Sequence, residues 1–197
     1  MAKNMQPILK RCRTLGIEPG VMGVDKKSNR NPGAQRRKPS EYAIQLNEKQ
    51  KAKFIYGVLE KQFRKYFVLA SKKEGIAGEN LLSILESRLD NVIFRLGFAD
   101  TRRQARQIVT HGHVLVNGKR VDIPSYLVKT GEVISLKSAT ATADWMKDII
   151  ERNSSRSVPK WISADKNTLS GTIADTPKRD DIDFEINETL IVELYSK

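Results

Sequence analysis

Cysteine and histidine are scarce in this sequence of 197 residues, which contains only Cys12, His111 and His113. A single cysteine excludes an intramolecular disulfide, and it does not by itself complete a zinc site of the cysteine and histidine type. No stretch approaches the roughly 18 consecutive apolar residues of a membrane span, and residues 1–10 lack the apolar region of a secretion signal. We therefore expect a cytoplasmic chain with no membrane partner and no cofactor.

Acidic residues are too few to balance the basic ones. Lysine and arginine number 35 and aspartate and glutamate 23, which gives a net charge of +12. This excess indicates a polyanionic partner, nucleic acid first and an anionic membrane surface second. The net charge is +8 over residues 1–40, +3 over 41–80, +4 over 81–137 and −3 over 138–197. We expect the first two thirds of the chain to bind the anion and the acidic remainder to pack on protein.

Residues 1–40 combine ten basic side chains with several glycines and prolines. Such a segment buries little apolar surface, so we predict an irregular basic arm. Two interpretations stay open, because the arm either takes a fixed shape against a partner or is a solvated leader. Its candidate phosphate contacts are Lys10, Arg11, Arg13, Arg36, Arg37 and Lys38.

Residues 40–73 show helical periodicity. Ser40 is suited to cap a helix that runs in one or two pieces to about Lys73, with apolar residues recurring at helical spacing. Lys49, Lys51 and Lys53 are too close in sequence to share one helical face. They therefore either reach different phosphates or keep the protein soluble.

Two further helical stretches are predicted at about 79–96 and 101–110. Arg88 and Arg95 project together from the first stretch, and either they reach nucleic acid or Arg88 pairs with an aspartate inside the fold. Asp100 or Thr101 is suited to cap the second stretch. This stretch carries a group of basic residues on its polar faces, namely Arg102, Arg103 and Arg106.

After Gly112 the apolar period changes to two, which is typical of strands. Asn117-Gly118 between short apolar runs is a strong hairpin signal, and it places Lys119 and Arg120 near the tip. Arginine forks beside such a tip suit phosphates held at a fixed spacing. A further strand is predicted at 132–137 and a helix at 142–153, followed by short strands and a final helix. Trp145 and Trp161 are expected in the core, with a platform for stacking of bases as the alternative.

The segment Thr101–Val109 followed by Gly112–Gly118 resembles the S4-type RNA-binding module. Pseudouridine synthases, some tRNA synthetases and heat-shock ribosome-binding proteins also carry this module, so alone it indicates only RNA binding. The flanking segments are similar to the bacterial ribosomal protein S4 family. The resemblance covers nearly the whole chain and is weakest over 1–38 and 138–180. Its flanking motifs are Ser40–Lys51, Ile55–Phe63, Gly78–Leu82 and Ile186–Lys197.

The pattern and the resemblance together imply an α+β fold. The N-terminal arm spans 1–40, and the helical part of the first domain spans 41–86. An inserted S4-type module spans 87–150, with a core over 87–137 of two helices packed on a small antiparallel sheet. The segment 151–197 is expected to return and pack on the first domain.

The resemblance further implies a structural constituent of the small ribosomal subunit that binds 16S ribosomal RNA and nucleates assembly of the 5′ domain. It also implies a role in translational accuracy, a contact with the neighbouring fifth small-subunit protein, and a place beside the path by which mRNA enters. Many relatives hold zinc with four cysteines in the arm, so a lone Cys12 implies a zinc-free version. The expected RNA contacts are Lys10, Arg11, Arg13, Arg36, Arg37, Lys38, Lys49, Lys51, Lys53, Arg102, Arg103, Arg106 and Lys119, with Asn117 and Gly118 shaping the hairpin tip.

Two other functions stay open. A free RNA-binding translational regulator would use the same module. An RNA-modifying enzyme needs a catalytic domain, but only about 60 acidic residues remain, without histidine, cysteine or a glycine-rich phosphate loop. The module arginines also have a plain alternative, a solvated helix face paired with nearby aspartates. His111 and His113 either meet a base or phosphate or merely finish the helix.

Overall fold

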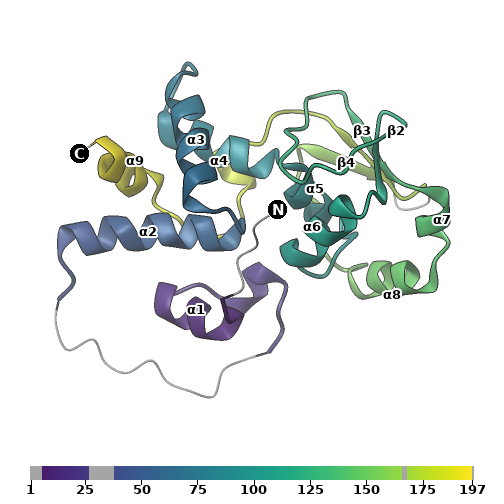
Figure 1. Cartoon of the computed structure of the whole chain (residues 1–197), viewed down its shortest axis with the longest axis horizontal. Coiled ribbons are helices and arrows are strands. Elements are labelled where there is room, and N and C mark those ends of the chain that lie inside the picture. The colour runs from purple at the N-terminus through teal and green to yellow at the C-terminus, as the bar shows by residue number, and fades with distance from the viewer. Residues whose placement is uncertain (1–5, 27–37, 166–167, 197) are drawn as a thin grey trace. The chain divides into compact units, whose positions relative to one another are not determined.

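The structure is a computed structural model that describes residues 6–26, 38–165 and 168–196 (Figure 1). The chain divides into two compact units, a helical unit (Met1–Leu82 and Asp183–Lys197) and a sheet unit (Ser83–Ile182). Helices and one small antiparallel sheet confirm the predicted α+β class. Among the described residues, no helix combines the length and apolarity needed to cross a membrane.

The helical unit contains α1, η1, α2, α3, most of α4, and α9 (Figure 1). Ser40 caps α2 as predicted, because its Oγ accepts a hydrogen bond from the Ala43 amide at 3.3 Å. The predicted helix over 40–73 breaks into two pieces at Gly57, whose φ is +63°. The bounds are α1 (Ile8–Leu15), η1 (Pro19–Met22), α2 (Glu41–Ile55), α3 (Glu60–Ser71), α4 (Ala77–Glu86) and α9 (Glu188–Ser196).

The described part of the N-terminal arm before residue 27 contains more regular structure than we predicted. Residues 8–15 form α1 and residues 19–22 form η1, where we predicted an irregular segment. Cys12 and Leu15 lie on one face of α1 and are buried together with Ile17 and Met22. The composition argument underestimated this segment because a few apolar residues at helical spacing suffice to bury one face against α2.

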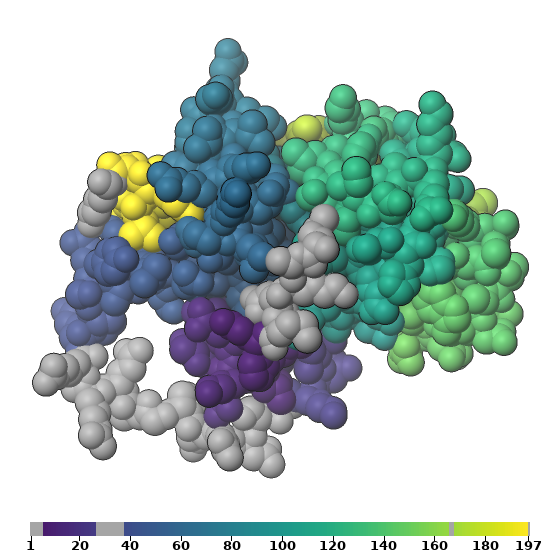
Figure 2. Space-filling view, in the orientation of Figure 1, coloured from purple at the N-terminus to yellow at the C-terminus, as the bar shows by residue number. Residues whose placement is uncertain are grey.

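The C-terminal helix α9 lies beside α2, so the end of the chain completes the helical unit (Figures 1 and 2). Gln45 Nε2 on α2 donates to Glu193 Oε2 on α9 at 3.0 Å. The Tyr195 ring stacks on Phe67 of α3 with 4.5 Å between ring centres. The first of these contacts joins residues 148 positions apart in sequence.

The sheet unit packs α5 and α6 with a five-stranded antiparallel sheet in the order β2-β1-β3-β5-β4. Its core contains Leu89 and Ile93 of α5, Ile108 of α6, and Val114 and Ile134 of the sheet. The bounds are α5 (Leu89–Arg95), α6 (Arg102–Thr110), β1 (Val114–Val116), β2 (Lys119–Arg120), β3 (Val133–Leu136), α7 (Ser138–Ala141), α8 (Asp144–Arg152), β4 (Ile162–Asp165), β5 (Ser170–Ile173) and η2 (Arg179–Asp181).

The helical stretch predicted over 79–96 is interrupted between α4 and α5. Arg88 has an extended backbone and forms an isolated bridge with Leu127. Its guanidinium is buried and its Nε donates to Asp90 Oδ1 at 3.0 Å. Of the two interpretations of Arg88, contact with nucleic acid or pairing with an aspartate inside the fold, the structure supports the second.

We predicted that the whole segment 151–197 packs on the helical part, and for residues 151–182 this prediction was wrong. They belong to the sheet unit, where β5 pairs with β3 in a register that sets Gly171 opposite Ile134. Trp161 and Ile173 are buried in the sheet unit's core. Hydrophobic burial against β3 therefore holds this segment, and only residues from Asp183 onward join the helical unit.

The two tryptophans have different surroundings. Trp161 is buried at 2% exposure, as predicted. Trp145 is 43% exposed, so the prediction that it lies in the core was wrong. Met146 and Ile149 form the buried side of α8, which turns Trp145 outward.

Candidate nucleic-acid interface

Helix α6 carries the module arginines, and a local capping arrangement fixes where it begins. The Thr101 hydroxyl accepts a hydrogen bond from the Gln104 amide at 3.2 Å. The Gln104 side-chain oxygen in turn accepts a hydrogen bond from the Asp100 amide at 2.7 Å. This arrangement satisfies two amides that would otherwise lack partners at the helix start.

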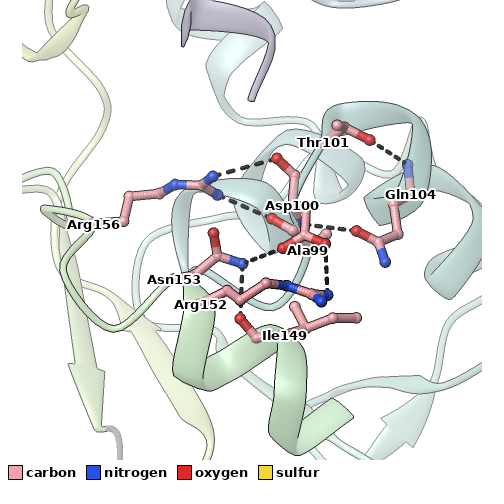
Figure 3. A network of polar contacts seen from close by, with 8 residues as sticks. All are labelled: Ala99, Asp100, Thr101, Gln104, Ile149, Arg152, Asn153 and Arg156. Atoms are coloured by element: carbon pink, nitrogen blue, oxygen red, sulfur yellow. Dashed lines mark hydrogen bonds and ion pairs between the residues drawn. The ribbon is translucent and has the colours of Figure 1, made fainter. Parts of the chain in front are cut away.

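A polar network around Asp100 anchors this start to the end of α8 and to the residues that follow it (Figure 3). Arg152 Nη2 and Asn153 Nδ2 donate to the two Asp100 carboxylate oxygens at 2.9 and 3.0 Å. Arg156 donates to the carbonyl oxygens of Ala99 and Asp100 at 2.9 and 3.3 Å. The chain leading into α6 is therefore held by residues about fifty positions away.

The β1–β2 hairpin has the predicted turn. Asn117 and Gly118 both have positive φ, at +48° and +75°, as a two-residue Asn-Gly turn requires. The Asn117 side chain accepts a hydrogen bond from the Val133 amide at 2.9 Å, which ties the tip to β3. Lys119 and Arg120 follow on an exposed strand. The hairpin therefore presents two cations on a backbone that is fixed from both sides.

Arg120 was not among the predicted contacts, although the Asn-Gly turn signalled its exposure. Its guanidinium lies directly over Gly112, where an added Cβ would come within 2.3 Å of Arg120 Nε. The Arg120 charge therefore lies at the C-terminal end of α6, beside His111 and His113. A glycine at this point gives the guanidinium room to lie there.

The three predicted arginines of α6 have different environments. Arg103 is exposed and Arg106 is half-buried, whereas Arg102 is only 6% exposed. Arg102 Nε donates to Asn91 Oδ1 at 2.8 Å, and its guanidinium lies 4.3 Å from the centre of the Phe94 ring. Arg102 thus joins α6 to α5, and its burial makes it poorly placed for a phosphate contact.

Asn91 also links Arg102 to a buried ionic cluster. Asn91 Nδ2 donates to Glu86 Oε2 at 2.6 Å, and Arg95 Nη2 pairs with Glu86 Oε1 at 2.9 Å. All four side chains, including Arg102, are buried. The cluster satisfies the charges that burial would otherwise make costly, so it orients α5 and α6 relative to each other.

Three of the predicted arm contacts lie on helix α1. Lys10 is exposed, while Arg11 and Arg13 are half-buried. Within the part of the chain that the structure describes, Arg11 Nε is buried and has no hydrogen-bond partner. Lys38 is exposed, and Arg36 and Arg37 lie outside the described residues.

The three lysines of α2 are held by glutamates of the same unit. Lys49 and Lys53 both bond Glu60, at 3.0 and 2.5 Å, and Lys51 bonds Glu48 at 2.8 Å. Burial alone would raise the pKa of Glu60, but hydrogen bonds from Lys53, Lys49 and Tyr195 lower it to about 2. The two lysines therefore share one carboxylate, and a phosphate at this place would compete with it.

No cluster of three or more metal-ligating side chains occurs among residues 6–26, 38–165 and 168–196. Cys12 is buried in α1, and burial raises the pKa of its thiol. A thiol with a raised pKa is a weak metal ligand, since the thiolate is the ligand form.

Two family models match this chain in adjacent segments. Residues 87–134 match the S4 domain, and residues 3–86 match the Ribosomal protein S4/S9 N-terminal domain. The first match covers α5, α6 and the hairpin. The matches define the class as that of S4-domain RNA-binding proteins.

Relatives that match over the full length of this chain identify its family within this class. The chain is 59% identical over 197 residues to "Small ribosomal subunit protein uS4" of Agathobacter rectalis and 60% identical over 198 residues to that of Lachnoclostridium phytofermentans, with all of both chains covered. The protein of the same name from Fusobacterium nucleatum is 52% identical over 199 residues, also with full coverage. The chain therefore belongs to the bacterial uS4 family, as its motifs predicted. This is a family of ribosomal components and not of enzymes.

Proposed function

We propose that this chain is a primary binder of 16S ribosomal RNA that nucleates assembly of the 5′ domain of the small subunit in the cytoplasm. The proposal includes a contribution to translational accuracy, contact with the fifth small-subunit protein and proximity to entering mRNA, without zinc. The observation that carries RNA binding is the set of cations at the hairpin and on α6, within the segment that matches the S4 domain.

The contacts in the sheet unit are Arg103, Arg106 and Lys119, with Arg120 added and with Asn117 and Gly118 shaping the turn. Structured RNA is recognised by shape and backbone, because its deep major groove is closed to side chains. Cations on a rigid hairpin and helix suit this task, since their spacing is set before binding. Arg102 acts as a positioning residue that holds α6 against α5.

The contacts in the helical unit are the cations of α1 and α2 together with the basic residues around Lys38. The exposure of Lys10 on α1 supports a contact there, whereas the buried Arg11 Nε is closed to an RNA acceptor. Lys49, Lys51 and Lys53 remain in the proposed set. Their glutamate partners hold the ammonium groups in place until a phosphate displaces the carboxylate.

A triple neutralisation tests the sheet-unit contacts. The variant Arg103→Gln, Arg106→Gln, Lys119→Gln should weaken binding to a transcript of the 5′ region of 16S ribosomal RNA by at least about tenfold. It should also reduce the salt slope of the affinity by roughly three. Filter binding over a salt series measures both quantities. Arg102 is left unchanged because it is buried.

The matched control removes the same amount of charge from the acidic third of the chain. Lys147→Gln, Lys160→Gln, Lys178→Gln changes three exposed lysines and should alter the affinity by less than about threefold. An equal loss of affinity in both variants would show that only net charge matters. That result would contradict the proposed interface.

A further inference from the structure

A groove in the sheet unit lies between the end of α6 and the start of α8. Its volume is about 360 Å³, and it is lined by Gln104, Gln107, Ile108, His111, His113 and Trp145. This volume is in the lower part of the roughly 300–1,000 Å³ range of small-ligand sites. The lining combines aromatic rings with side-chain amides.

The rings stand close together. The His113 and Trp145 rings meet edge to face with 5.7 Å between centres, and His111 lies 6.1 Å from His113. Trp145 is 43% exposed, whereas Trp161, Phe94 and Phe98 of the same unit are buried. A large aromatic ring left open beside two others provides a surface for stacking.

His113 is held in position. Its Nδ1 lies 2.9 Å from the Thr140 hydroxyl. Burial lowers the pKa of His113, and the nearby positive charges of His111, Lys137 and Arg120 lower it further. The lowered pKa favours the neutral imidazole, whose ring presents a π face.

We propose that this groove receives a single unstacked nucleobase of single-stranded RNA, an inference that rests on the RNA-binding function proposed above. Stacking on aromatic rings is the usual way in which unpaired bases are held, and the amides of Gln104 and Gln107 can bond base edges. Among the described residues that line the groove there is no arginine or lysine, which disfavours a phosphate as its occupant. Arg120 lies beside its rim at Gly112, where the backbone of the same strand would pass.

The test compares a short oligoadenylate with an abasic oligonucleotide of equal length and charge, using the full chain. Oligoadenylate should quench tryptophan fluorescence and the abasic probe should not, because Trp161 is buried and only Trp145 is open to a base. Equal quenching, or equal affinity, for the two probes would overturn the proposal.

Substitutions in the groove test whether oligoadenylate binds there. Trp145→Ala and His111→Ala should each weaken binding of labelled oligoadenylate, the first by about tenfold, while Trp145→Phe should keep most of the affinity. Asp148→Ala, an exposed change on the same helix, is the matched control and should change nothing. Unchanged affinity in both alanine variants would overturn the proposal, including the case in which the groove instead holds a protein side chain.

Parallel binding of the 16S transcript separates this inference from the proposed function. A chain that binds the transcript but shows no preference for oligoadenylate over the abasic probe would overturn the groove alone. A chain that prefers oligoadenylate at Trp145 but does not bind the transcript would overturn the assembly role alone.

Discussion

Among the arginines, burial separates two roles that look the same in sequence. Arg88, Arg95 and Arg102 are buried and paired with Asp90, Glu86 and Asn91. Arg103 and Arg120 are exposed on the same unit. A buried charge is costly to leave without its partner, so the buried arginines orient helices, whereas the exposed ones face solvent.

Glu60 provides a prediction at this scale. Glu60→Gln should lower the free energy of unfolding at pH 7 by about 1 kcal/mol, a modest effect because the side chain is 48% exposed. Its pKa is about 2 in the folded chain against 4.5 for a free glutamate. The stabilisation is complete above pH 4.5 and is lost as the pH falls towards 2.

Denaturant unfolding of both proteins at several pH values measures this effect. The difference between wild type and variant should shrink steadily below about pH 4.5. Glu185→Gln, an exposed change in the same unit, should stay within about 0.5 kcal/mol of wild type at pH 7. A difference for Glu60→Gln that stays constant down to pH 2 would contradict the assignment.

Among the elements, β5 depends on a close approach that only glycine allows. Gly171 lies in the middle of the strand, and a Cβ added there would come within 2.4 Å of Leu96 Cδ2. Leu96 is buried in the same core, so its side chain has little space to move. The absence of a side chain at Gly171 therefore lets β5 lie close to Leu96.

Gly171→Ala should destabilise the chain by about 1–3 kcal/mol, because overpacking a buried site strains its neighbours. Thermal or denaturant unfolding checks the value. Gly20→Ala is the control, since nothing lies within 4 Å of a Cβ there and its φ is not in the left-handed region. Equal stability of the two variants would contradict this prediction, because it would show that the core around Leu96 rearranges to make room for the added methyl group.

Over the whole molecule, positive charge is concentrated in the first two thirds of the chain and the last third is acidic. Both units nevertheless contain part of the acidic third, because residues 138–182 complete the sheet unit and α9 completes the helical unit. The acidic residues of this third are therefore divided between the two units, and the chain as a whole keeps a net charge of +12.

The affinity of the full chain for the 16S transcript should therefore fall steeply with salt. If six to ten phosphates are contacted, we expect a loss of about 10³–10⁵ between roughly 50 and 200 mM salt. Titration with labelled transcript gives the slope. A loss smaller than about tenfold over this range would mean that few phosphates are neutralised.

Local features were predictable from the sequence. The Ser40 and Thr101 caps and the Asn117-Gly118 turn each depend on residues within a few positions of one another, and the structure confirms all three. The motif of residues 101–118 was sufficient to predict the RNA-binding module, and the flanking motifs were needed to predict the family. The candidate site was predicted less completely, because exposure had to be inferred from periodicity alone.

The sequence by itself determined the local elements, the uneven charge and the family, because these depend on short spacings and on composition. Only the tertiary structure decided that Arg102 is buried against Asn91, that Lys49 and Lys53 share Glu60, and that β5 lies beside β3. It also turned Trp145 outward beside the two histidines. Each of these outcomes depends on a partner distant along the chain or on the face a helix buries, and burial between such partners sets whether a charge or ring meets protein or solvent.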